Sequence, residues 1–318
     1  MYKTEKIMEK YDLGLAFVCE YDLEFINLIE FSLQQEGIST FRVTTENISE
    51  VTERFTKKEI SFNFYLDRAS DVDDDFEELA GMLSRRHCII FNPYNKISHA
   101  IDKANMHLEF ITAGLNVPYS IIIPPHSEKE ELYISMDDLA ILGRPFIIKP
   151  CNTTGGGIGV VTGAESLKEI MEERIANHKD KYILQQKIYP KMLDGKRAWF
   201  RSFWAFGKAI PTWWDDQIHI YNEISDDEIK FFGLKKLFSI TKTIANLTGL
   251  DFFSTEIVLT PQNLPVVIDY VNDQCDMRFN SKHPDGVPDN VVKEIIDNLI
   301  KKIKYLKKNK IQSKRISK

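Results

Sequence analysis

A glycine-rich segment between two apolar runs constrains the fold of this chain more than any other feature. The run 146–149 ends at Lys149, and the run 158–162 begins nine residues later. The glycines of the segment are Gly155, Gly156, Gly157 and Gly159. Because glycine has no side chain, the backbone amides stay open to surround an anion, and Lys149 would place a cation beside it. The pattern predicts a strand, a phosphate-binding loop and a second strand.

The residues around this segment exclude two common phosphate-binding loops. No Gly-Lys-Ser or Gly-Lys-Thr follows, and the residues after Gly159 favour a strand over a helix, which excludes a Walker loop. The pattern GxGxxG also fails, because position 162 is threonine. A flap that closes over the phosphates of a nucleotide is the functional interpretation. A flexible hairpin without a ligand is the structural alternative.

Residues 12–95 alternate short apolar runs with amphipathic segments. Strands are expected at 12–20, 39–43, 61–67 and 87–91, with helices at 24–37 and 73–84. This alternation predicts a small parallel α/β domain. The acidic residues 71–78 are expected to form the solvated start of a helix rather than a metal site, because carboxylates suit that end of the helix dipole.

The remainder of the chain predicts antiparallel strands mixed with helices. One helix is expected at 99–118, closed by Gly114, another at 226–248, and a third at 288–306. Strands are expected at 120–125, 146–149, 158–162 and 182–188, in a hairpin over 198–214, and in a second hairpin of 255–259 and 265–271. We expect four parts: an N-terminal domain (1–97), a small subdomain with the glycine loop (98–184), a C-terminal subdomain (185–306) and a basic tail (307–318).

Acidic residues interrupt two apolar strands near the C-terminal end. Glu256 lies in 255–259 and Asp269 in 265–271, and Asn272 and Asp273 follow directly. A carboxylate in an apolar strand is costly unless it is paired or binds a cation. Oxygen ligands are those that Mg²⁺ prefers, and such an ion would bridge the phosphates of a nucleotide. The structural alternative is that Asp and Asn only end a strand and begin a turn.

With these motifs in this order, the chain resembles the ATP-grasp superfamily of carboxylate–amine or carboxylate–thiol ligases over about residues 92–277. Lys103, in an Asp-Lys pair that opens a segment ending in Ala-Gly-Leu-Asn-Val-Pro, resembles a family lysine that reaches ATP. The segment 146–159 resembles the phosphate loop, and Lys149 resembles the second ATP lysine. The strand 182–188 resembles the hinge that binds adenine, which implies contacts from Gln185, Gln186, Lys187 and Ile188.

The resemblance extends to the residues expected to carry the chemistry. Arg201, seven residues before Lys208, resembles an arginine that faces the transferred phosphate or the substrate. Glu256, Asp269 and Asn272 match the metal triad for one or two Mg²⁺ ions.

Two departures from the family pattern stand out. The family spacing is acid-x-Asn, whereas Asp269 and Asn272 are three residues apart. Either a bulge realigns them, or Asp269 and Asp273 share the ligand role. Gln186 occupies a hinge position where an acidic residue is frequent.

The resemblance implies a multi-domain α+β and α/β chain, in which two ATP-grasp subdomains grip ATP behind a small parallel α/β domain. It also implies an ATP- and Mg²⁺-dependent ligase that joins a carboxylate to an amine through an acylphosphate and releases ADP and phosphate. Lys149 and Arg201 would be catalytic, and Arg68, Trp214 and Arg278 are candidates for substrate binding. The alternatives are an ATP-grasp kinase that phosphorylates a hydroxyl group and a nucleotide-binding protein without catalysis.

Charge and composition limit the partners. The net charge is −6, and because residues 301–318 contribute +9, the first 300 residues carry −15. Such an acidic body repels nucleic acid, although the tail could touch RNA weakly. The four scattered cysteines, the absence of a signal-like start and the lack of an apolar run of about 18 residues indicate a cytoplasmic protein with reduced thiols and no membrane span. Small-molecule substrates are expected, and a homodimer is an open alternative.

Overall fold

The computed structural model describes residues 8–152 and 158–316, with the side chains described as far as residue 309. The N-terminal part is a parallel sheet of four strands in the order β2-β1-β3-β4. These strands are β1 (Glu9–Phe17), β2 (Thr40–Val43), β3 (Ile60–Arg68) and β4 (Ile89–Phe91). The helices of this part are α1 (Leu23–Gln35), α2 (Ile48–Thr56) and α3 (Asp74–Arg85). The predicted parallel α/β fold is confirmed.

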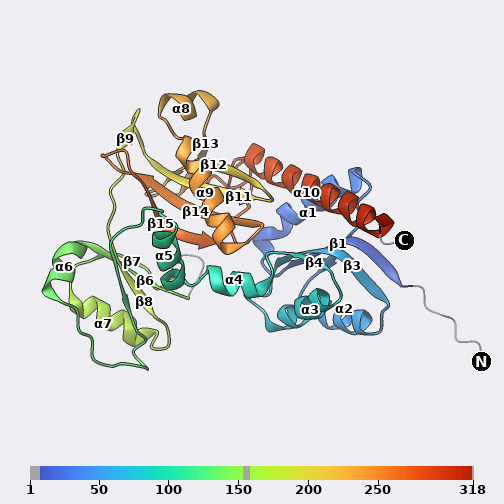
Figure 1. Ribbon diagram of the computed structural model, residues 1–318, viewed down its shortest axis with the longest axis horizontal. Coiled ribbons are helices and arrows are strands. Elements are labelled where there is room, and N and C mark those ends of the chain that lie inside the picture. The colour runs from blue at the N-terminus through green and yellow to red at the C-terminus, as the bar shows by residue number, and fades with distance from the viewer. Residues whose placement is uncertain (1–7, 153–157, 317–318) are drawn as a thin grey trace, which may run out of the picture.

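Helical spacing of apolar residues explains how these helices cover the sheet. In α1, Phe25, Ile26, Ile29 and Leu33 are buried along one stripe. In α3, Asp73 caps the first turn by accepting from the backbone N–H of Asp75, which bears out the expected acidic helix start. Figure 1 places α1 on one side of the sheet and α2 and α3 on the other. The sequence analysis missed α2, because its nine residues are mostly polar.

The second part is an antiparallel sheet in the order β5-β8-β6-β7. Its strands are β5 (Ser120–Ile123), β6 (Phe146–Pro150), β7 (Val161–Ala164) and β8 (Tyr182–Gln186). It carries α6 (Met136–Leu142) and α7 (Leu167–Ala176), which the sequence analysis did not predict. The glycine-rich segment joins β6 to β7, and β7 begins three residues later than expected. This part lies at the opposite end of the molecule from the N-terminal sheet (Figure 1).

The third part is a five-stranded antiparallel sheet in the order β13-β12-β11-β14-β15. Its strands are β11 (Trp199–Ala205), β12 (Lys208–Asp215), β13 (Ile220–Glu223), β14 (Phe252–Leu259) and β15 (Pro265–Asn272). A short ribbon of β9 (Met192–Leu193) and β10 (Lys196–Arg197) precedes it, and α9 (Lys235–Thr248) packs on β11 and β12. Both predicted hairpins are confirmed, whereas β13 was not predicted.

Two helices predicted as continuous are each broken. The expected helix 99–118 is α4 (Tyr94–Ala100) followed by α5 (Lys103–Thr112). The break occurs because Asp102 is extended and caps α5 with its side chain. The expected helix 226–248 is α8 (Asp226–Phe231) followed by α9, with Gly233 at a φ of 69° between them. Glycine adopts this positive φ without strain, which lets the chain turn between the two helices.

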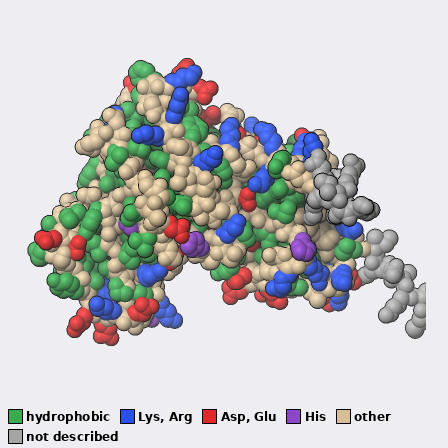
Figure 2. All heavy atoms as spheres, viewed as in Figure 1, with side chains coloured by type: hydrophobic (Ala, Val, Ile, Leu, Met, Phe, Trp, Pro, Cys, Tyr) green, Lys and Arg blue, Asp and Glu red, His purple; other side chains and the backbone are tan. Residues whose placement is uncertain are grey.

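The last helix, α10 (Asp289–Ile316), extends well into the expected basic tail. Its buried face includes Val292, Ile295, Leu299 and Ile303, and it packs against α1 and β11. Figure 1 shows it running alongside α1 from the third part of the molecule to the first. On the face in Figure 2, acidic and basic side chains are interspersed rather than gathered by sign. Within the described residues, no helix has the length and apolar character needed to span a bilayer.

Candidate active site

A cavity of about 820 Å³ lies between the four-stranded antiparallel sheet and the five-stranded sheet. One wall comes from β6, β7 and the segment 185–189, and the other from β11 to β15. The cavity is therefore built by segments that are far apart in the sequence. The predicted residues that line it are Lys103, Lys149, Gln185, Gln186, Lys187, Ile188, Arg201, Trp214, Glu256, Asp269, Asn272 and Arg278.

Two lysines face one carboxylate at the boundary of the two sheets. Lys149 Nζ donates to the Ile268 carbonyl over 2.8 Å and lies 3.7 Å from Asp269 Oδ1. The backbone N–H of Lys103 donates to the Cys151 carbonyl over 3.0 Å, which ties the start of α5 to the segment after β6. Burial alone would raise the pKa of Asp269, but Lys149, Lys103 and Arg201 outweigh it and the pKa is lowered. Burial lowers the pKa of Lys103, against the opposing effect of Asp269.

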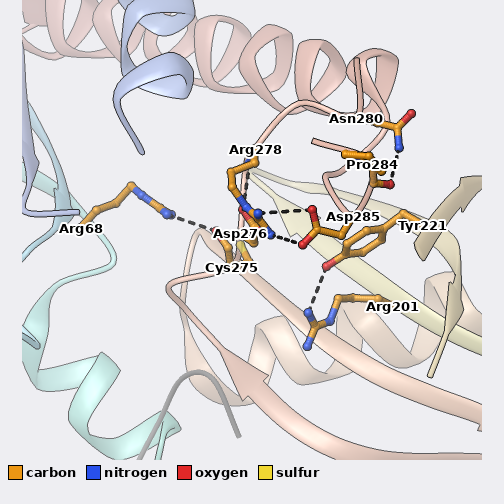
Figure 3. A network of polar contacts seen from close by, with 9 residues as sticks. All are labelled: Arg68, Arg201, Tyr221, Cys275, Asp276, Arg278, Asn280, Pro284 and Asp285. Carbon is orange, nitrogen blue, oxygen red and sulfur yellow. Dashed lines mark hydrogen bonds and ion pairs between the residues drawn. The ribbon is translucent and has the colours of Figure 1, made fainter. Parts of the chain in front are cut away.

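Arg201 and Glu256 form a close pair on adjacent strands. They are direct partners in the β11–β14 register, and Arg201 Nη2 donates to Glu256 Oε1 over 2.7 Å. Arg201 Nη1 donates to the Tyr221 hydroxyl over 3.0 Å, as Figure 3 shows. The guanidinium carbon also lies 5.0 Å from the centre of the Trp214 ring. Burial alone would lower the pKa of Arg201, but Tyr221 and Glu256 outweigh this effect and the pKa is raised.

Bulges in the β14–β15 hairpin bring the expected metal ligands to one cavity. Ser254 is opposite Asn272 and Glu256 is opposite Asp269, so β15 has one residue more than β14 over this stretch. The extra residue offsets the spacing of three between Asp269 and Asn272. The bulge that we considered from the sequence is present. Asp273, the alternative ligand, is buried and does not line the cavity.

The hinge segment lines the cavity opposite the five-stranded sheet. Gln185 is buried and its Nε2 donates to the Tyr270 hydroxyl over 3.2 Å. Lys187 Nζ donates to the Thr162 carbonyl on β7 over 3.2 Å. Gly159 has a φ of 71°, and a Cβ there would lie 3.3 Å from Pro150, so this position requires glycine. The predicted loop residues Gly155, Gly156 and Gly157 lie outside the described residues.

The three candidates for substrate binding occupy different environments. Trp214 lines the cavity, whereas its neighbour Trp213 is buried on the other face of the sheet. Arg278 also lines the cavity, but it donates to both Asp276 and Asp285 (Figure 3). Arg68 does not line the cavity. It is buried and forms a two-point pair with Asp22, at 2.9 and 2.7 Å.

Sequence reasoning missed several residues of this cavity. Trp199, whose indole donates to Glu256, is not among the residues singled out from the sequence, because alternating aromatics in a strand are more often core. Tyr221, on the unpredicted β13, and Asp285, in a loop, were not considered. The position of Trp199 two residues before Arg201 was the available signal, since both side chains then share one face of the strand.

The donor set at this point fits a hard divalent cation. Glu256, Asp269 and Asn272 supply carboxylate and amide oxygens, which Mg²⁺ prefers, and all three line the cavity. No group of three or more histidine, cysteine or acidic side chains with metal-ligand geometry occurs among the described residues. None of the three proposed ligands is a cysteine or a histidine, so the site lacks the soft ligands of a zinc site. Its remaining ligands would be phosphate oxygens or water.

Comparison with known proteins gives a clear answer for the fold. No family model matches the sequence, and no curated protein matches it. The structure is similar to D-alanine–D-alanine ligase from Bacillus anthracis complexed with ATP, with a TM-score of 0.65, 14% identity and coverage of 94% of this chain and 99% of that one.

Two further solved structures are similar over comparable lengths. An ATP-grasp RimK domain protein from Sphaerobacter thermophilus has a TM-score of 0.61 at 19% identity, covering 90% of this chain and 98% of that one. The macrocyclase MdnC from Microcystis aeruginosa, bound with the precursor peptide MdnA, has a TM-score of 0.56 at 13% identity, covering 91% and 99%. The chain has the ATP-grasp fold. The resemblance inferred from the sequence is thereby confirmed at the level of the fold.

Proposed function

We propose that this protein is an ATP- and Mg²⁺-dependent ligase that joins a carboxylate to an amine through an acylphosphate. One observation carries the proposal: Lys103, Lys149 and Arg201 line the same cavity as Glu256 and the other two oxygen ligands. Cations beside hard oxygen ligands suit the triphosphate of a nucleotide and its counter-ion. The ATP-bound ligase from B. anthracis, which has the same fold, supports ATP as the nucleotide.

The nucleotide would lie along the wall that comes from the small sheet. Residues 185–188 would contact adenine, and Ile147 and Ile268 offer it apolar surface. Lys103 and Lys149 would bind phosphate oxygens, and the backbone amides of the glycine segment are proposed as further phosphate ligands. Lys149 already bridges β6 and β15, so phosphate bound there would contact both sheets.

Glu256, Asp269 and Asn272 would hold one or two Mg²⁺ ions. When bound, the metal would neutralise phosphate charge and orient the γ-phosphate for transfer. Arg201 would contribute a permanent cation at the same place, because Tyr221 and Glu256 raise its pKa against the opposing effect of burial. One nitrogen of Arg201, Nε, is buried and has no hydrogen-bond partner among the described residues, so the side chain has an unused donor there.

The proposed reaction has two steps. A carboxylate oxygen of the first substrate attacks the γ-phosphorus, the bond to the β–γ bridging oxygen breaks, and ADP leaves. The amine nitrogen of the second substrate then attacks the acyl carbon, the carbon–oxygen bond to phosphate breaks, and the nitrogen loses a proton. The protein aligns the groups and excludes water, which would otherwise hydrolyse the acylphosphate.

The far end of the cavity, beyond Arg201, would bind the acceptor. Trp214, Tyr221 and His219 line it together with Arg278. Arg278 donates to the carboxylates of both Asp276 and Asp285, and these bonds raise its pKa. We therefore assign Arg278 to the wall of this end rather than to a substrate carboxylate. A small amine is the proposed acceptor, although MdnC, with the same fold, was solved with a peptide.

The test is ADP and phosphate release from Mg²⁺-ATP in the presence of pooled small carboxylates and amines. In the Lys149→Ala variant we expect turnover to fall at least ~100-fold, as when one donor to a transition-state charge is lost. Lys191→Ala is the matched control, because Lys191 lies on the surface and bonds Asn263 outside the cavity. Its turnover should equal that of the wild type.

The products separate the proposal from its alternatives. An amide with free phosphate supports the ligase, whereas a stable phosphoester supports a kinase. If the wild-type protein binds Mg²⁺-ATP but consumes none with any acceptor pool, the ligase assignment fails. Normal turnover in Lys149→Ala would remove Lys149 from the catalytic site.

A further inference from the structure

Both oxygens of the Glu256 carboxylate are held by donors from the neighbouring strand. Arg201 Nη2 donates to Oε1 over 2.7 Å, and Trp199 Nε1 donates to Oε2 over 2.9 Å. Trp199 and Arg201 are two residues apart on β11, so their side chains lie on the same face of the sheet. Each carboxylate oxygen can still accept a further ligand, because it has two lone pairs. Glu256 is thus held in one orientation while it lines the cavity.

The indole of Trp199 is itself fixed by packing. It packs against a buried cluster formed by Val258, Val266 and Ile268. On another side, the guanidinium carbon of Arg197 lies 6.0 Å from the ring centre, and Arg197 is held by a two-point pair with Asp216. Packing of this kind leaves the ring few other orientations, so its N–H stays directed at Glu256.

Arg201 alone would not hold Glu256 in this orientation. Arginine and carboxylate groups often form two parallel hydrogen bonds, which direct both oxygens at the guanidinium. Here Arg201 bonds only Oε1, because its other terminal nitrogen bonds Tyr221. The bond from Trp199 opposes rotation of Oε2 towards Arg201. One lone pair on Oε2 is thereby kept for a ligand from the cavity.

We propose that Trp199 is a positioning residue, whose indole N–H orients Glu256 to bind a divalent cation. The proposal rests on the proposed function, because it takes Glu256 as a ligand to the cation of a bound nucleotide. An indole N–H only donates, so Trp199 does not compete with Glu256 for the cation. It is also neutral, so it orients the carboxylate without cancelling the negative charge that attracts the metal.

The experiment compares the affinity for Mn²⁺ of wild-type protein and Trp199→Phe, each saturated with ADP. Phenylalanine keeps an aromatic ring and removes the N–H. Loss of a partner that orients a metal ligand typically weakens metal binding ~10–100-fold, and we expect the Kd for Mn²⁺, measured by electron paramagnetic resonance, to rise in that range. The affinity for ADP without metal should stay unchanged, which separates orientation of the ligand from general damage to the site.

Trp213→Phe provides a matched control in the same sheet. Trp213 also donates its indole N–H to a carboxylate, Glu228 Oε1 at 3.2 Å, but Glu228 does not line this cavity. The affinity of the Trp213→Phe variant for Mn²⁺ should equal that of the wild type. A double-mutant cycle adds a second criterion: in a Glu256→Gln background, Trp199→Phe should change the Kd for Mn²⁺ less than two-fold.

A Kd for Mn²⁺ in Trp199→Phe within two-fold of the wild type would overturn the proposal. Should Trp199→Phe not fold, indole ¹⁵N–¹H spectra of the wild type and Glu256→Gln decide instead. The Trp199 resonance should shift when Glu256 is replaced, and an unchanged resonance would overturn the assignment. If the wild type with ADP binds no Mn²⁺, the proposed function fails first, and this role for Trp199 fails with it.

Discussion

The charge of Asp269 depends on three cations that come from three different elements. Lys149 comes from β6, Lys103 from the start of α5 and Arg201 from β11. Burial alone raises the pKa of an acid, and here the cations reverse the effect. A phosphate that binds Lys103 and Lys149 would compete with Asp269 for their positive charge. A divalent cation bound to Asp269 would then replace that charge beside the carboxylate. The proposed cations and metal ligands are thus mutually dependent.

Burial also determines how the cysteines react. Burial raises the pKa of both Cys151 and Cys275 to about 12, whereas Cys19 is exposed. Because the thiolate is the reactive form, only about one in 10⁴ of these buried thiols is ionised at pH 8. We expect a disulfide reagent at pH 8 to label Cys19 rapidly and both buried cysteines at least ~100-fold more slowly. Mass spectrometry of the labelled peptides checks this.

Cys19→Ser should remove the rapid labelling at residue 19 and leave the slow labelling of Cys151 and Cys275 unchanged. Rapid labelling of Cys151 in the folded protein would contradict its burial.

Helix α5 is joined to β15 by a buried histidine. His107 is 2.5 Å from the Tyr270 hydroxyl through Nδ1, and the two rings are stacked. Tyr270 also accepts from Gln185 of the hinge strand. One hydroxyl on β15 therefore connects the helix that begins with Lys103 to the strand proposed to bind adenine.

This histidine should make stability depend on pH. Burial lowers the pKa of His107, so the folded state takes up a proton at a lower pH than the unfolded chain, which does so below about pH 6.5. The unfolded state then binds more protons, and stability should fall as the pH drops through that value. The contribution is at most about 1.4 kcal/mol per pH unit. Urea unfolding at pH 7.5 and 5.5 measures it.

His107→Phe should reduce the loss of stability between these two pH values. Tyr270→Phe is the comparison, because it removes the hydroxyl and keeps the histidine. It should lower stability at both pH values by a similar amount. An equal pH dependence in wild type and His107→Phe would show that His107 does not contribute.

A buried arginine and the last helix join the parts of the molecule. Arg68, at the end of β3, pairs with Asp22 within the N-terminal part. It also donates to the Cys275 carbonyl over 3.1 Å, as Figure 3 shows. Arg68 therefore links the N-terminal sheet to the loop that follows β15. Arg68, predicted as a candidate substrate ligand, has this contact instead of a place in the cavity.

Loss of Arg68 should destabilise the whole protein. Arg68→Ala leaves the Asp22 carboxylate buried without its cation, which typically costs about 3–5 kcal/mol. Urea unfolding at pH 7.5 checks this, with Lys57→Ala as a control at an exposed pair that should change stability little. A loss below about 1 kcal/mol in Arg68→Ala would show that the contacts of Arg68 contribute little to stability.

The basic C-terminal segment is partly neutralised by the body of the protein. Lys302 pairs with Asp251, Lys304 with Glu36 and Lys307 with Asp12, at 3.2, 2.6 and 2.8 Å. All three lysines lie on α10, which continues past residue 307, where a separate tail was expected to begin. The expected weak contact with RNA, the homodimer and the domain boundaries at 97, 184 and 306 stay predictions.

Local patterns in the sequence were sufficient to predict most elements and the order of the motifs. The alternation of residues 12–95 predicted the parallel sheet, and the glycine segment after Lys149 predicted the two strands, β6 and β7, that flank it. Both hairpins of the third sheet followed from their apolar runs and turns. These features depend on neighbours within a few residues, because backbone geometry and side-chain periodicity act at that range.

The tertiary structure alone decided which of the polar residues meet. The bond from Trp199 to Glu256 and the bonds from Arg278 to Asp276 and Asp285 have no local signature. The bulge that offsets the spacing of Asp269 and Asn272 was one of two alternatives that the sequence left open. Each depends on strand register or on loops packed from distant segments. A sequence states which groups are present, whereas burial and register determine their partners, their charge and hence their chemistry.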